Sequence, residues 1–287
     1  MHENNRTSAT TPPASAPEEP PAIRRRLTAA IVLRSVALNA AFYISYPLVM
    51  IGGIFFLALP RRHAMAALRW WSRVFIAMCR HLGGIELRIE GREHLPTEPT
   101  ALLVAGKHQS FWETFALFHL FPDPAIVLKR ELGFIPLVGW FLRKFRMIMV
   151  AREAGPKALK DLVRQGQEAV AANRQIIIFP EGHRMHPLAA PDYKPGVAAL
   201  YGRLGVACVP FALNAGVFWP RRTFWRWPGT ITVRFLPAIE PGLNRRDFMQ
   251  RLQQAIEPAT QELVEEGLRQ LDDAGLLHEP PPPRART

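Results

Sequence analysis

One polar cluster in this chain carries side chains suited to proton transfer. His108 follows the apolar run Ala101–Ala105 after a short turn, and Glu113 lies five residues further on. Histidine is the side chain best able to move a proton near neutral pH, and a carboxylate close to it can orient the ring. The pair is therefore a candidate general base with its orienting acid.

A second polar cluster is suited to anion binding. It comprises Glu181, Gly182 and Arg184, and it follows the apolar run Ile176–Ile178. The planar guanidinium of arginine binds phosphate or carboxylate through paired hydrogen bonds. Because both clusters follow predicted buried strands, we expect them to meet at the carboxyl ends of one sheet, where such folds place their binding sites.

Both clusters also have a purely structural interpretation. Ser110 and Glu113 fit a capping box, in which the glutamate satisfies backbone N–H groups at a helix start. A capping role for Glu113 does not exclude its pairing with His108. In the second cluster, Glu181 and Arg184 could form an ion pair that holds their own loop.

A metal site is a further alternative for the histidines. His108, His183 and His186 could be the ligands of a metal-dependent hydrolase. Their spacing matches no common zinc pattern, so we predict no metal.

The elements that must position these clusters alternate between strands and helices. Strands are expected at 85–90, 101–105, 125–128, 147–150, 175–179, 206–213 and 230–235, and helices at 111–121, 156–172, 196–204 and 245–271. This alternation predicts an α/β fold, in which helices flank a mostly parallel sheet.

A long apolar segment precedes this predicted fold. Residues 35–60 contain no charged side chain. This uncharged segment is longer than the roughly 20 apolar residues that a helix needs to cross a bilayer. Arginines flank it on both sides, and residues 64–82 form an amphipathic basic helix typical of a membrane interface. We predict membrane association, either as one spanning helix or as a bent pair that inserts without crossing. A buried helix of a soluble protein is the remaining alternative.

Composition limits the class of partner. The chain has 287 residues and a formal charge of +12. Such a charge suits an anionic membrane or a phosphorylated substrate, and no nucleic-acid-binding motif is present. The two cysteines, Cys79 and Cys208, fit free thiols in a reducing compartment. A basic-aromatic stretch at 218–227 is predicted either to rest at the membrane interface or to pack as an ordinary loop.

The predicted organisation has four parts. Residues 1–22 and 272–287 are rich in proline or polar residues and are expected to be disordered tails. Residues 23–84 form the membrane-associated helical segment, and residues 85–271 form the α/β domain.

Taken in order, the motifs resemble those of the glycerolipid acyltransferases, in particular the 1-acyl-glycerol-3-phosphate acyltransferases. The resemblance rests on His-x4-acid at 108–113, Phe-Pro-Glu-Gly-x-Arg at 179–184, Lys129–Leu132, Ile135-Pro136 with Gly139, Arg152, Tyr193–Gly196 and Val209-Pro210. It covers roughly residues 85–240.

The resemblance implies transfer of a fatty acyl group from acyl-CoA or acyl-carrier protein to the free hydroxyl of 1-acyl-glycerol-3-phosphate, giving phosphatidic acid without a further cofactor. It implies that His108 is the general base, that Glu113 orients it, and that backbone N–H groups near Ser110 stabilise the oxyanion. The residues implied in substrate binding are Lys129, Arg130, Arg152, Glu181, Gly182 and Arg184. The implied partners are the lysophospholipid, the acyl donor and membrane lipids, and the implied location is the cytoplasmic face of a bacterial inner membrane.

Three departures from the family pattern leave the acceptor open. Glu113 replaces the usual Asp, His183 follows Gly182 where Thr or Ser is usual, and Ala151 stands where an Asp often precedes the arginine. An acyltransferase for another lysolipid, such as a lyso-amino-acid lipid, therefore stays an alternative. A membrane-interface binding module without catalysis is a further alternative.

Overall fold

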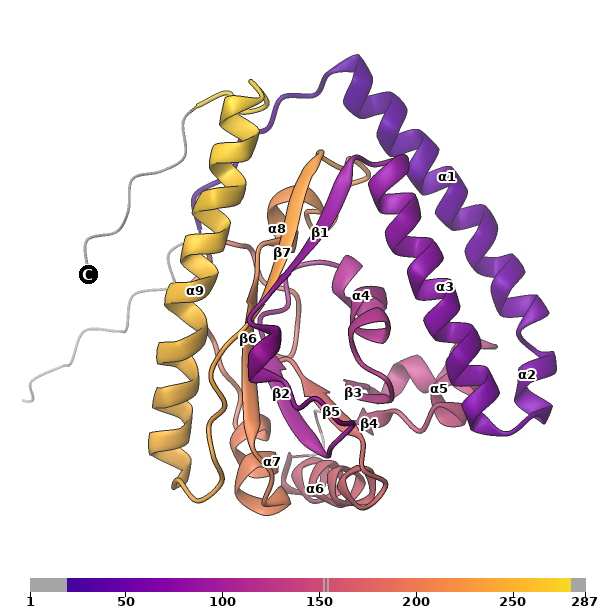
Figure 1. Ribbon diagram of the computed structural model, residues 1–287, viewed down its shortest axis with the longest axis vertical. Coiled ribbons are helices and arrows are strands. Elements are labelled where there is room, and N and C mark those ends of the chain that lie inside the picture. The colour runs from indigo at the N-terminus through magenta and orange to yellow at the C-terminus, as the bar shows by residue number, and fades with distance from the viewer. Residues whose placement is uncertain (1–19, 152, 154, 280–287) are drawn as a thin grey trace, which may run out of the picture.

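The computed structural model describes residues 20–151, 153 and 155–279 (Figure 1). Its strands are β1 (Ile85–Glu90), β2 (Leu102–Gly106), β3 (Pro124–Lys129), β4 (Ile148–Val150), β5 (Gln175–Ile178), β6 (Cys208–Leu213) and β7 (Gly229–Phe235). Its helices are α1 (Ala29–Gly52), α2 (Phe55–Ala58), α3 (Arg61–His81), α4 (Trp112–Leu120), α5 (Val138–Lys144), α6 (Gly155–Ala171), α7 (Gly196–Leu204), α8 (Ala215–Phe218) and α9 (Arg245–Asp273), with 3-10 turns η1 (Arg92–His94) and η2 (Arg130–Phe134).

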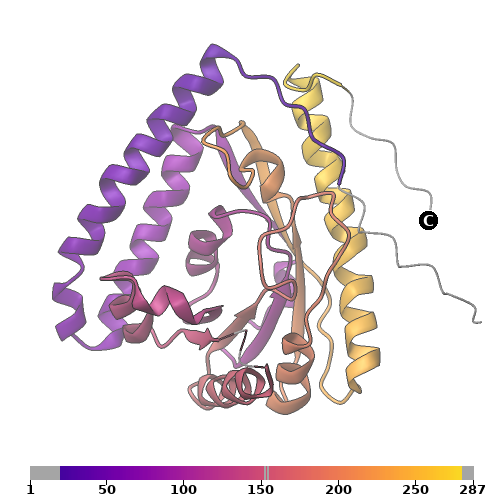
Figure 2. The same cartoon turned by 180° about the vertical axis from the view of Figure 1, so that it is seen from behind.

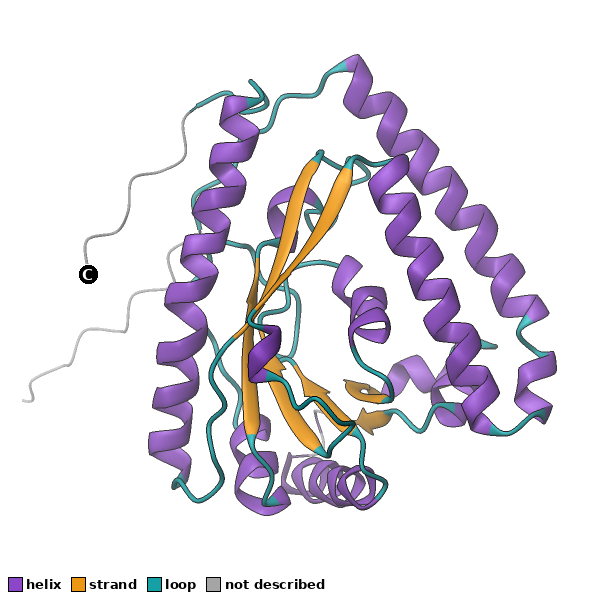
Figure 3. Cartoon of the chain, in the orientation of Figure 1, coloured by secondary structure: helices purple, strands orange, loops and turns teal. Residues whose placement is uncertain are grey.

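The described strands form one sheet in the order β1-β7-β6-β2-β5-β3-β4. Among them, every neighbouring pair is parallel except β6 and β7. The predicted α/β fold with a mostly parallel sheet is confirmed, and the strands and helices lie within a few residues of the predicted ranges (Figure 3).

The central strands are apolar on both faces because helices cover both. Val104 and Ile177 belong to one apolar cluster with α3 and α4, whereas Leu103 and Ile176 belong to another with α6, α7 and α9. Successive side chains of a strand point to opposite faces, so a strand covered twice has no polar position. Figure 1 shows α9 on one side of the sheet and α1, α3 and α4 on the other.

The amino-terminal segment is a helical hairpin that lies along the domain. Helices α1 and α3 run side by side in both views (Figures 1 and 2). The inner face of α1 presents Phe42, whose ring lies 5.8 Å from that of Phe75 and 5.7 Å from that of Phe115. The outer face is apolar and exposed, with Tyr43 at 64% and Leu48 at 63%. The described helix Ala29–Ala58 is long and apolar enough to cross a membrane, and it is consistent with membrane association.

The stretch predicted as a basic-aromatic loop packs in part beneath α1. Asn39 Nδ2 donates to the carbonyl of Phe224 at 2.9 Å, and Ser35 Oγ accepts from the backbone N–H of Arg226 at 2.9 Å. Arg226 lies over the ring of Trp219 at 4.4 Å, and burial lowers its pKa to about 10. The loop therefore anchors the first half of the hairpin.

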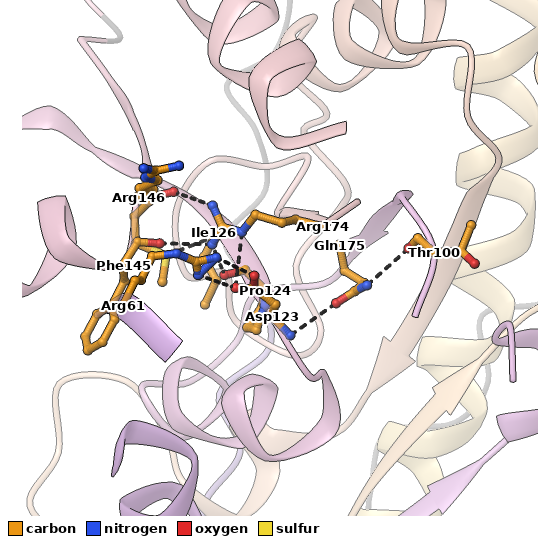
Figure 4. Close-up of polar contacts among 10 residues, drawn as sticks. Arg61, Thr100, Asp123, Pro124, Ile126, Phe145, Arg146, Arg174 and Gln175 are labelled. Carbon is orange, nitrogen blue, oxygen red and sulfur yellow. Dashed lines mark hydrogen bonds and ion pairs between the residues drawn. The ribbon is translucent and has the colours of Figure 1, made fainter. Parts of the chain in front are cut away.

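A buried polar network anchors the other half (Figure 4). Arg61, the first residue of α3, makes a two-point ion pair with Asp123 ahead of β3. Arg174 Nε also donates to Asp123, at 3.1 Å, and its remaining nitrogens donate to the carbonyls of Pro124, Phe145 and Arg146. The hairpin is thus fixed to the domain at two places.

The carboxyl-terminal region is ordered further than predicted. Helix α9 continues to Asp273, and Leu276 and Leu277 are buried. The carbonyl of Leu276 accepts a hydrogen bond from the backbone N–H of Arg26 at 2.8 Å, so the residues after α9 are tied to the segment ahead of α1. The prediction of a disordered tail from residue 272 is therefore wrong for residues 272–279, because Leu276 and Leu277 supply apolar surface that packs against the domain. Residues 1–19 and 280–287 lie outside the described part.

Candidate active site

The strand register brings the two predicted clusters to one edge of the sheet. Leu102 of β2, Gln175 of β5 and Pro124 of β3 lie at the same level. His108 and Glu181 each follow six residues later, so they leave the sheet together. Lys129 ends β3 at a similar height, two strands from β2 and therefore about 10 Å across the sheet.

His108 and Glu113 form the predicted pair. His108 Nδ1 lies 2.7 Å from Glu113 Oε2. An ionised carboxylate only accepts hydrogen bonds, so Nδ1 carries the proton and Nε2 keeps its lone pair. The Glu113 side chain is 1% exposed and that of His108 is 17% exposed. The ring is thus fixed from the inside while the proton-accepting nitrogen remains for a substrate.

Glu113 is also the cap of its helix. Its Oε1 accepts from the backbone N–H groups of Gln109 and Ser110, each at 2.9 Å, and Ser110 Oγ accepts from Trp112 N at 3.2 Å. Capping and orientation of His108 therefore coexist in one carboxylate. The N–H groups of Gln109 and Ser110 are thus already engaged by Glu113, and an oxyanion site near Ser110 stays a prediction.

The second cluster contacts His108 directly. The ring of Phe179 stacks on the imidazole with 4.1 Å between ring centres and 19° between the planes. The backbone N–H of Met185 donates to the carbonyl of His108 at 2.7 Å. Phe179 therefore packs against one face of the His108 ring, a contact that sequence reasoning missed.

Glu181 is buried rather than open to a substrate. Its side chain is 0% exposed, and its Oε1 lies 2.6 Å from Lys107 Nζ. Burial raises the pKa of Glu181, and the ammonium of Lys107 opposes that rise. The sequence predicted that Glu181 binds substrate. In the structure its carboxylate is enclosed with the ammonium of Lys107 and so holds the loop that carries His108.

Helix α9 completes this buried network. Glu257 Oε1 lies 3.1 Å from Lys107 Nζ and accepts a hydrogen bond from Tyr193 Oη at 2.7 Å. Burial raises the pKa of Tyr193, and the charge of Glu257 adds to the rise. Neither Glu257 nor Tyr193 was predicted to act with the clusters. The spacing of 150 residues between Lys107 and Glu257 offers no local signal.

Three arginines gather beside the second cluster. Gly182 turns the chain with φ of +73°, a conformation that favours glycine, and Arg184 follows. The carbonyl of Arg184 accepts from the guanidinium of Arg221. Burial lowers the pKa of Arg221, and the charges of Arg222 and Arg184 lower it further. The sequence placed Arg221 and Arg222 in a separate loop, and the structure adds them to this group.

Lys129 and Arg130, two further residues predicted to bind substrate, lie at the end of β3. Lys129 is exposed and faces Glu131 at 3.9 Å, and Arg130 opens η2. Arg152 lies outside the described residues. His186 Nδ1 accepts from Leu188 N at 3.3 Å, and the described part of the chain holds no group of three His, Cys, Asp or Glu residues placed for a metal ion.

Comparison with known proteins finds a family model that matches this part of the chain. Residues 86–214 match the model of the Acyltransferase family. These residues are similar to an acyltransferase domain, and we use that name for the matched part. The match begins one residue into β1 and ends directly after β6, so it includes both polar clusters.

Relatives of the acyltransferase domain carry one recurring name. A Pseudomonas aeruginosa protein named 1-acyl-sn-glycerol-3-phosphate acyltransferase is 38% identical over 169 residues, which are 59% of this chain and 65% of that protein. A Chlamydomonas reinhardtii protein named 1-acyl-sn-glycerol-3-phosphate acyltransferase is 28% identical over 60% of this chain and 52% of its own length. The matched part therefore spans less than two thirds of each relative.

A solved structure shares the fold around the acyltransferase domain. The crystal structure of the 1-acyl-sn-glycerophosphate (LPA) acyltransferase PlsC from Thermotoga maritima superposes with a TM-score of 0.60 at 19% identity. The superposition covers 84% of this chain and 96% of that one. It therefore extends beyond the acyltransferase domain to most of the chain.

Proposed function

We propose that the protein transfers a fatty acyl group from a thioester donor to the free hydroxyl of 1-acyl-glycerol-3-phosphate, giving phosphatidic acid. The observation that carries this proposal is the His108 ring, held at Nδ1 by Glu113 while Nε2 is left to accept a proton. The names of the P. aeruginosa and C. reinhardtii relatives support the choice of reaction.

The proposed reaction proceeds without an acyl-enzyme. His108 Nε2 removes the proton of the acceptor hydroxyl as its oxygen attacks the thioester carbonyl. Glu113 stabilises the imidazolium that forms. The tetrahedral intermediate then expels the thiolate of the donor, which receives the proton from His108. The bond from carbon to sulfur is broken, and an ester is formed.

The arginine group is the proposed site of the acceptor phosphate. Arg184, Arg221 and Arg222 repel one another, and an anion between them removes that repulsion. Arg184 is far from His108 in the sequence but near it in the fold, because the backbone N–H of the next residue, Met185, donates to the carbonyl of His108. Lys129, Arg130 and Arg152 are proposed to assist in positioning the glycerol phosphate, as the family resemblance implies.

The hairpin supports a proposed mode of membrane binding. The segment α1–α2 is fixed to the domain at two places, through Asn39 in the middle of α1 and through Arg61 at the start of α3. We infer that the hairpin lies in one leaflet without crossing, which is the bent-pair alternative. Arginines occur on both sides of the apolar run, so the positive-inside rule favours the cytoplasmic face of a bacterial inner membrane.

The test is an assay of the purified full chain in detergent with labelled acyl-CoA or acyl-carrier protein. The acceptors are lysolipids with a phosphate monoester, with a substituted phosphate, and lyso-amino-acid lipids without phosphate. We expect turnover of 1-acyl-glycerol-3-phosphate, and a large rise in KM for it in Arg184→Gln. Preferred turnover of a phosphate-free acceptor contradicts the proposed substrate, and no turnover of any acceptor contradicts the proposed activity.

A further inference from the structure

A short projection beside the candidate site presents large apolar side chains to solvent. It consists of η2 and α5, residues 130–144, and we call it the 130–144 projection. Leu132 is 37% exposed, Phe134 70%, Ile135 45% and Trp140 51%. It begins directly after Lys129, at the edge of the sheet that carries His108.

The projection is held stiffly by its own backbone. Leu137 has φ of 62° and ψ of −56°, and the N–H of Val138 donates to the carbonyl of Pro136 at 2.7 Å. This is the rare and strained γ-turn with positive φ. A Cβ on Gly139 would meet the carbonyl oxygen of Gly133 at 2.0 Å, so the two segments touch through glycine. Because the backbone is constrained in this way, it holds the exposed apolar side chains in fixed positions at the surface.

The apolar surface of the projection continues that of the hairpin. A Cβ on Gly53, at the end of α1, would meet the ring of Phe141 at 2.9 Å. Lys144 Nζ donates to the carbonyl of Leu57 in α2 at 2.8 Å. Figures 1 and 2 both show α5 next to α2. Ile54 and Phe55, which are 42% and 67% exposed, belong to the same segment of the hairpin, between these two contacts with α5.

Exposed apolar side chains are confined to one part of the molecule. Within residues 20–151, 153 and 155–279, those that are large and exposed belong to the hairpin and the segment ahead of it, the projection, Phe111 and Phe224. The surfaces of α6, α7 and α9 carry none in that part of the chain. Lys129 directly precedes the projection, and Arg130 and Arg143 lie near its two ends; all three are exposed, and Glu131 is the acid beside Lys129. An apolar tip with a cationic border matches the acyl chains and anionic headgroups of a bilayer.

We propose that the 130–144 projection inserts into the bilayer interface as a second membrane anchor beside the hairpin. The occupant of this surface is the lipid bilayer, and the inference rests on the proposed membrane association. The geometry places Lys129 and the mouth of the site against the headgroup layer, where a lysolipid presents its hydroxyl and phosphate.

The direct test is an environment-sensitive fluorophore attached to a single introduced cysteine. Cys79 and Cys208 are 0% exposed and burial raises the pKa of both thiols, so neither competes for the label. Labels are placed on the full chain as Phe134→Cys, as Leu48→Cys on the hairpin, and as Gln253→Cys on α9. Each variant is mixed with vesicles that contain phosphatidylglycerol, with and without a lipid-borne nitroxide quencher.

We expect a blue shift and nitroxide quenching at positions 134 and 48, and neither at position 253. A shift at position 48 without one at 134 overturns the inference while leaving membrane association intact. The absence of a shift at both positions overturns both proposals.

A kinetic test separates a bilayer contact from a contact with the substrate's acyl chain. The pair Phe134→Ser with Trp140→Ser is compared with the apolar control pair Phe134→Leu with Trp140→Phe. Loss of two aromatic side chains from the bilayer contact should weaken vesicle binding and vesicle-based turnover by roughly tenfold or more. Turnover of a short-chain acceptor below its micelle concentration should stay unchanged. An equal loss on that monomeric acceptor overturns the inference, because the side chains would then bind the substrate itself.

Discussion

Replacing Lys107 by methionine removes the cation that lies between two carboxylates. Methionine keeps the unbranched shape of the stem, so the change is mainly one of charge. Glu181, which is 0% exposed, then loses its partner at 2.6 Å, whereas Glu257 keeps the hydroxyl of Tyr193 and is 25% exposed. The penalty therefore falls on Glu181.

Removing one partner of a buried ion pair costs about 3–5 kcal/mol, because the other charge remains in a medium that cannot solvate it. For a chain of this size, that loss lowers Tm by roughly 6–20 °C. The double variant Lys107→Met with Glu181→Gln leaves no such charge. We expect the double variant to recover more than half of the lost stability, although it carries one substitution more.

The stability lost in Lys107→Met also depends on pH. Burial already raises the pKa of Glu181, and loss of Lys107 removes the main opposing influence. Since the folded-state pKa then exceeds the unfolded value of about 4.3, the deficit is absent below that pH and grows as pH rises. Thermal unfolding in detergent at pH 5 and pH 8 measures it. A single variant as stable as wild type at pH 8, or a double variant less stable than the single one, refutes the reasoning.

Three further predictions concern other parts of the molecule. Glu113→Gln should lower kcat far more than Glu113→Asp, because an amide cannot stabilise the imidazolium; equal rates would leave Glu113 only its capping role. Arg174→Met should lower the free energy of unfolding by about 3 kcal/mol or more, since three carbonyls lose their donor and Asp123 keeps only Arg61, and an unchanged Tm would contradict this. Burial, and then nearby arginines, lowers the pKa of His119, so stability should fall as pH drops below about 6.5, with a shallower slope in His119→Gln by thermal unfolding.

The elements and the paired clusters were predictable because their signals are local. The apolar runs before His108 and Glu181 are long enough to identify doubly covered strands, and such strands in an α/β fold present their ends at one edge. The pairing of His108 with Glu113 follows from five residues of turn and helix start. The conformation of these few residues depends little on the rest of the chain.

The contacts that went unpredicted join distant segments. Lys107 meets Glu257 only because α9 packs against β6 and β7, and Arg221 meets Arg184 only because the loop after α8 folds back toward the second cluster. Composition shows charge in each segment but not which charges are enclosed together. The buried state of Glu181 arises from that packing, so its motif alone suggested a substrate ligand.

The proton-accepting role of His108 is the centre of this account. The direct measurement is kcat for acyl transfer to 1-acyl-glycerol-3-phosphate by His108→Ala, alongside Tm and vesicle binding of the same preparation. A general base contributes about 10²–10⁴-fold, so we predict a loss of that size or greater in a variant that stays folded and bound to vesicles. Turnover within a few-fold of wild type by that variant would contradict the account.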